Sequence, residues 1–96
     1  MTRMKKLDLD AARKPVLSQA LEEAMRTQPK DMRGIYRATL RDLSRCGDRI
    51  QLNEAQSGAA KYALELFARA HSGDDACREM LRQLTMTRKQ YRAYCG

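Results

Sequence analysis

Apolar residues recur every three or four positions along most of this chain, which is the spacing of one face of an α-helix. The alternation of polar and apolar residues that marks a half-buried strand is absent, and β-branched residues are scarce. The sequence therefore predicts no strand and an all-α fold: a compact bundle of four helices plus a short C-terminal helix. Its 96 residues suffice for one domain.

The first helix is predicted to begin near Pro15, since proline is tolerated in a first helical turn, and to stop before Pro29. Its apolar stripe comprises Val16, Leu17, Ala20, Leu21, Ala24 and Met25. The second helix is predicted from Pro29 or Lys30 to Cys46, with Asp31 in its N-terminal turn. Its inner face is expected to carry Met32, Ile35, Tyr36, Thr39, Leu40 and Leu43.

The third helix is predicted to start at Asn53, where Gln56 completes a capping-box pattern, and to end near His71. It is apolar enough to be the central helix of the bundle. We expect its inner side to carry Ala55, Ala59, Tyr62, Ala63, Leu66, Phe67 and Ala70, with Ala60 and Leu64 widening the apolar arc.

The remaining segments are shorter. A fourth helix is predicted over about residues 74–84 and a last one over 88–94. Residues 1–13 read as a polar leader in which Leu7 and Leu9 dock on the core. The single domain is expected to span residues 1–96.

Positive charge is clustered on the predicted second helix. Arginines occupy every fourth position, at Arg33, Arg37, Arg41 and Arg45. Residues four apart lie on one helical face, where like charges repel by about 0.2–0.5 kcal/mol per pair. The row lies opposite the apolar positions, so it is predicted to be exposed. Lys61, Glu65 and Arg69 of the third helix alternate in sign at the same spacing, which is typical of an ordinary solvated face.

The net charge of +7 comes from 19 basic and 12 acidic residues. The excess lies in three segments, residues 1–14, 30–47 and 74–96. Although many basic domains are simply soluble, a clustered excess favours an acidic partner, either a nucleic acid or an acidic protein face. The candidate binding residues are Lys30, Arg33, Arg37, Arg41, Arg45, Arg88, Lys89 and Arg92.

Two functional hypotheses use these residues. In the first, a small regulatory or accessory protein binds DNA, RNA or a nucleoprotein complex through the basic helix face, because arginine and lysine make most phosphate contacts. In the second, an adaptor or inhibitor docks on an acidic protein surface, where arginine grips carboxylates. The last two predicted helices have the outline of a helix-turn-helix, although their turn lacks a glycine. A homodimer through the Gly58–Ala63 surface is a further possibility.

Catalytic and metal-binding patterns are not apparent. No known nucleophile, phosphate-loop or zinc-protease motif occurs, so the protein is not expected to be an enzyme. Cys46, His71, Cys77 and Cys95 match the number of zinc ligands but lack a short knuckle, so no metal or cofactor is expected. The odd cysteine count, with no signal-peptide pattern and no long apolar run, predicts a cytoplasmic protein with no membrane contact.

Residues 28–40 follow the pattern Q-P-x-x-[LM]-R-x-x-[YF]-R-x-x-L, which resembles a stretch in the theta subunit of bacterial DNA polymerase III. The resemblance covers about one-seventh of the chain. A basic amphipathic helix that follows a proline produces the same pattern. No residue role is transferred from it.

Overall fold

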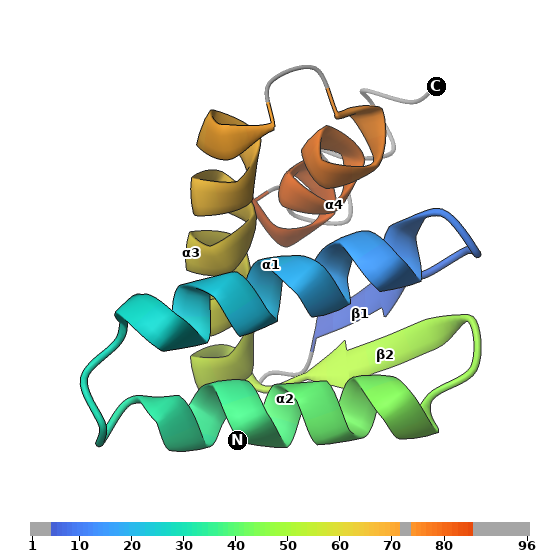
Figure 1. Ribbon diagram of the computed structural model, residues 1–96. Helices are drawn as coiled ribbons and strands as arrows, with labels where there is room; N and C mark the ends of the chain where they lie inside the picture. The colour runs from blue at the N-terminus through green and yellow to red at the C-terminus, as the bar shows by residue number, and fades with distance from the viewer. Residues whose placement is uncertain (1–4, 72–73, 86–96) are drawn as a thin grey trace.

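The computed structural model describes residues 5–71 and 74–85. Its elements, in chain order, are β1 (Lys5–Asp8), α1 (Arg13–Thr27), α2 (Arg33–Arg45), β2 (Arg49–Leu52), α3 (Glu54–Ala70) and α4 (Asp75–Thr85) (Figure 1). The all-α fold class is confirmed, since the described residues form a compact globule of four helices with only a small two-stranded sheet. The predicted last helix, residues 88–94, lies outside the described residues.

α3 is the central helix, as predicted. It packs against α1, α2, α4 and β2, and α1 crosses in front of it in Figure 1. Its buried face is displaced from the prediction, however, because Ala60 and Leu64 lie at its centre while Tyr62 is 43% exposed. The alanines of α3 add little apolar area, so they do not decide which face turns inward. The residues of α3 that are buried are Gln56, Ala60, Ala63, Leu64 and Phe67.

The prediction that the chain contains no strand is wrong. β1 pairs antiparallel with β2, and Leu7 lies opposite Ile50. Both side chains are buried, as is that of Leu9, whose N–H donates to the carbonyl of Asp48 at 2.7 Å. The leader therefore docks through Leu7 and Leu9 as expected, but it does so as part of a sheet. β2 does alternate, with Arg49 and Gln51 exposed and Ile50 and Leu52 buried, but this four-residue run is at the lower limit of the strand signal and was overlooked in the sequence.

α1 begins at Arg13, two residues before Pro15, which occupies its first turn. The carboxylate of Asp10 caps this end by accepting hydrogen bonds from the backbone N–H groups of Ala12 and Arg13 at 3.0 and 2.8 Å. The buried residues of α1 are Leu17, Ala20, Leu21 and Ala24, all within the predicted stripe.

α2 begins at Arg33, later than predicted. Residues 29–32 form a turn instead, closed by a hydrogen bond from the N–H of Met32 to the carbonyl of Pro29 at 3.0 Å. Asp31 consequently precedes the helix, and Met32 is 42% exposed rather than part of the inner face. The remainder of the predicted inner face is confirmed at the buried residues Tyr36, Thr39 and Leu43.

Side chains cap the two C-terminal helices of the described chain. Asn53 and Gln56 form the predicted capping box at the start of α3, with each side chain bonded to the other residue's backbone N–H. Asp74 accepts a hydrogen bond from the N–H of Cys77 at 2.9 Å at the start of α4. Within the described residues, no helix combines the length and apolarity needed to cross a bilayer.

Candidate functional site

The best candidate site is the outer side of α2, where Arg37, Arg41 and Arg45 are exposed. We call these three residues the α2 arginine face. The opposite side of the same helix holds the buried residues Tyr36, Thr39 and Leu43, so packing of the inner side fixes the outward direction of the arginines. With a rise of about 1.5 Å per residue, the three arginines extend over about 12 Å of helix.

The charges of the α2 arginine face are not neutralised within the described residues. The ion pairs in that part of the chain join Arg13 to Asp10 at 3.8 Å, Arg49 to Asp8 at 2.9 Å and Arg82 to Glu79 at 3.3 Å. All three pairs lie outside α2. None of the three arginines of the α2 arginine face is paired with an acid of the described residues.

Asp42 is the one acidic residue of α2, and it is directed elsewhere. Its Oδ2 accepts a hydrogen bond from Nε2 of Gln56 at 3.0 Å, and Gln56 is buried at the start of α3. Asp42 therefore lies on the flank of α2 that contacts α3 and forms no ion pair with Arg41 or Arg45 among the described residues.

Small residues adjoin the arginines. Gly34, Ala38, Arg41 and Arg45 follow one another at helical spacings of four, three and four residues, so they form a single exposed row. A Cβ placed on Gly34 meets no atom within 4 Å. The N-terminal half of this row is therefore formed by small exposed residues, with open space around Gly34.

The other site residues predicted from the sequence do not belong to the α2 arginine face. Arg33 is half-buried, and its Nε donates to the carbonyl of Gln28 at 3.2 Å, so it helps to close the α1–α2 loop. Lys30 is exposed in that loop. Arg88, Lys89 and Arg92 lie outside the described residues. Among the candidate cations that the structure describes, Lys30 and the three residues of the α2 arginine face are exposed.

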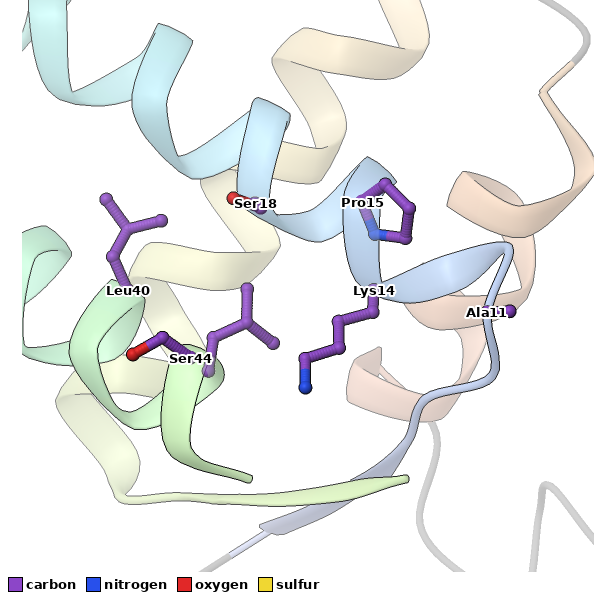
Figure 2. A pocket seen from close by; sticks show the side chains of 7 residues that line it. Ala11, Lys14, Pro15, Ser18, Leu40 and Ser44 are labelled. Atoms are coloured by element: carbon purple, nitrogen blue, oxygen red, sulfur yellow. The ribbon is translucent and has the colours of Figure 1, made fainter. Parts of the chain in front are cut away.

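A pocket between α1 and α2 was not predicted. It has a volume of about 420 Å³ and mostly apolar walls, lined by Ala11, Lys14, Pro15, Ser18, Leu40, Leu43 and Ser44 (Figure 2). Nζ of Lys14 donates to the carbonyl of Cys46 at 2.7 Å. Helical periodicity alone cannot reveal such a site, because the pocket depends on how α1 and α2 cross.

The thiols and the histidine contribute no assembled metal site in the part of the chain that is described, where no group of three or more His, Cys, Asp or Glu side chains could hold an ion. Cys46 is half-buried and Cys77 is buried, and both are free thiols. Burial, and secondarily the Asp74 carboxylate, raises the pKa of Cys77 to about 11. The ring of His71 stacks on Phe67 with centroids 4.2 Å apart.

Comparison of the chain with protein-family models, curated proteins and solved structures finds no match.

Proposed function

We propose that this protein is a small, non-enzymatic, cytoplasmic accessory or regulatory protein that binds the phosphate backbone of nucleic acid through the α2 arginine face. One observation carries the proposal: Arg37, Arg41 and Arg45 are exposed on one helical face with no ion pair to a described acid. Guanidinium groups are suited to phosphate oxygens because they donate two parallel hydrogen bonds.

The geometry of α2 supports a contact with a polyanion rather than with an isolated ion. Arginines spread over about 12 Å lie too far apart to share one phosphate. Duplex DNA carries one charge per about 1.7 Å of its axis, so several phosphates lie within this span. Phosphate contacts carry no sequence information, so we expect the α2 arginine face to bind nucleic acid without a preference for particular bases.

The test compares two variants with the same charge. The α2 variant carries Arg37→Gln, Arg41→Gln and Arg45→Gln. The control variant carries Arg26→Gln, Arg69→Gln and Arg78→Gln, which are exposed arginines on α1, α3 and α4. Binding of fluorescent duplex DNA and single-stranded RNA is measured by anisotropy at about 50 mM salt, where phosphate contacts are strong.

The α2 variant is expected to bind at least about tenfold more weakly than the wild type, since each charge-assisted hydrogen bond contributes about 1.5–3 kcal/mol. The control variant is expected to lose less. Equal losses in the two variants would show that net charge alone drives binding, and no binding of either nucleic acid by the wild type would reject the proposal.

The alternative partner is an acidic protein surface. One observation favours it: the mostly apolar α1–α2 pocket adjoins the α2 arginine face, and apolar contact beside charge is typical of protein interfaces. Under this alternative the wild type binds no nucleic acid, while capture from its native host returns one stoichiometric protein that the α2 variant fails to retain.

A further inference from the structure

The α1–α2 pocket combines an apolar floor with a cation, Lys14, that has no ion pair with an acid of the described residues. Leu40 and Leu43 of α2 line it together with Lys14 and Pro15 of α1, and Figure 2 shows Leu40, Lys14 and Pro15 around it. A volume of about 420 Å³ lies within the range of roughly 300–1,000 Å³ that is usual for ligand sites. The pocket is therefore large enough to receive a bulky apolar side chain.

Lys14 supplies the charge inside the pocket. Its ammonium group is half-buried, and its one recorded hydrogen bond goes to the carbonyl of Cys46, the C-cap residue of α2. A helix C-terminus carries only about half a negative charge, so the carbonyl offsets the lysine incompletely. An ammonium group has three donors. Lys14 therefore retains capacity to bind a carboxylate placed at the pocket.

The α2 wall of the pocket adds further positive charge. Leu40 and Ser44 line it, and Arg37 and Arg41 lie one helical turn before them on the same side of α2. The hydroxyl of Ser44 donates to the carbonyl of Arg41 at 2.8 Å, so its proton is already used within α2. The pocket is thus bordered by Lys14 on the α1 side and by Arg37 and Arg41 on the α2 side.

From this arrangement we propose that the α1–α2 pocket binds an acidic peptide segment of a partner protein. A bulky apolar side chain of the peptide packs among Pro15, Leu40 and Leu43. An adjacent carboxylate binds Lys14, and flanking carboxylates face Arg37 and Arg41. Charge complementarity selects this occupant, because an uncharged apolar segment leaves three cations without partners. The proposal deepens the acidic-protein alternative given above and shares Arg37 and Arg41 with the α2 arginine face, while Lys14 and the apolar floor belong to the pocket alone.

The test uses two capped, fluorescein-labelled hexapeptides of equal charge. The first is Asp-Glu-Leu-Phe-Asp-Glu, and the second has serine in place of both apolar residues. Wild-type protein is expected to bind the first at least about tenfold more tightly, because only its Leu and Phe can bury apolar surface in the pocket. Equal affinities, or no binding of the first peptide at about 1 mM, would overturn the proposal.

Variants then locate the contact. Ser18→Leu fills the pocket from α1, and we expect it to abolish the preference for the apolar peptide. Its control, Gln19→Leu, makes the same apolar addition at an exposed neighbour and is expected to leave the preference unchanged. A preference that survives in Ser18→Leu would place the peptide elsewhere and overturn the proposal.

Lys14→Met keeps an unbranched side chain one atom shorter and removes the charge. It is expected to weaken binding of the apolar peptide by about two- to fivefold, as for a partly exposed ion pair. Lys61→Met, an exposed lysine on α3, is the matched charge control and is expected to have a smaller effect. Equal effects of the two lysine variants would contradict the role of Lys14, and thermal denaturation verifies that each variant is folded.

Discussion

Nε2 of Gln56 donates a hydrogen bond to Oδ2 of Asp42 at 3.0 Å, which joins the start of α3 to the helix that carries the arginine face. The same Gln56 side chain accepts a hydrogen bond from the N–H of Asn53 at 3.1 Å through its Oε1. One buried amide thus caps α3 and holds the single carboxylate of α2 on the α3 side. Among the described residues, Asp42 forms no ion pair with the α2 arginine face.

Replacement of Gln56 by alanine is therefore expected to destabilise the protein by about 1–3 kcal/mol, because it removes half of the capping box and one hydrogen bond to a charged group. Asp42→Asn is the companion variant. Its amide oxygen can still accept from Gln56, so a loss below about 1 kcal/mol is expected. Urea denaturation measures both changes, and equal losses in the two variants would contradict this assignment.

Ser57 presents the opposite case. Its Oγ is buried and has no hydrogen-bond partner among the described residues. Removing an unsatisfied buried hydroxyl relieves a desolvation penalty, and alanine is the better helix former. Ser57→Ala is expected to raise the free energy of unfolding by about 0.5–2 kcal/mol. Ser44→Ala, at an exposed position of α2, controls for helix propensity. A gain in the free energy of unfolding for Ser57→Ala that is no larger than for Ser44→Ala would contradict the buried-hydroxyl explanation.

Cys77 should make stability depend on alkaline pH. Its Sγ donates to the carbonyl of Leu64 at 3.2 Å, and burial, with a smaller effect of Asp74, raises its pKa to about 11. The ordinary pKa of a cysteine thiol, 9.0, is that of the unfolded chain, so unfolding releases a proton above about pH 9. The stability from the neutral buried thiol is complete below about pH 9 and is lost between there and about pH 11, by about 1.4 kcal/mol per pH unit.

Urea denaturation between pH 7 and pH 10.5 measures this loss, with Cys77→Ala as the control. Burial and the nearby Tyr62 also raise the pKa of Tyr36, so some alkaline destabilisation remains in Cys77→Ala. The wild type is expected to lose more stability with rising pH than Cys77→Ala. Identical pH profiles would show that Cys77 has no such role.

Local signals in the sequence predicted local features well. The Asn53–Gln56 capping box depends on four consecutive residues, and it forms as expected. The exposure of Arg37, Arg41 and Arg45 follows from the apolar face of their own helix, which tertiary packing preserves. Met32 shows the limit of this reasoning, because the turn after Pro29 removes it from the helix that periodicity assigned to it.

Features that join distant segments were missed. Leu7 and Ile50 pair across more than 40 residues, and the short alternation of β2 alone does not show which segment it pairs with. Lys14 and Leu40 line one pocket only because α1 and α2 cross as they do. Gln56 likewise reads as a cap in the sequence, while its bond to Asp42 requires the packing of α3 against α2.

The central claim is that the α2 arginine face binds phosphates, and the salt dependence of duplex-DNA affinity tests it most directly. For each phosphate contacted, the slope of log affinity against log salt concentration changes by about −0.9. The Arg37→Gln, Arg41→Gln, Arg45→Gln variant is expected to flatten the wild-type slope by about three units, while the Arg26→Gln, Arg69→Gln, Arg78→Gln control leaves it nearly unchanged. A wild-type slope retained in the α2 variant, or flattened equally in both, would contradict the account.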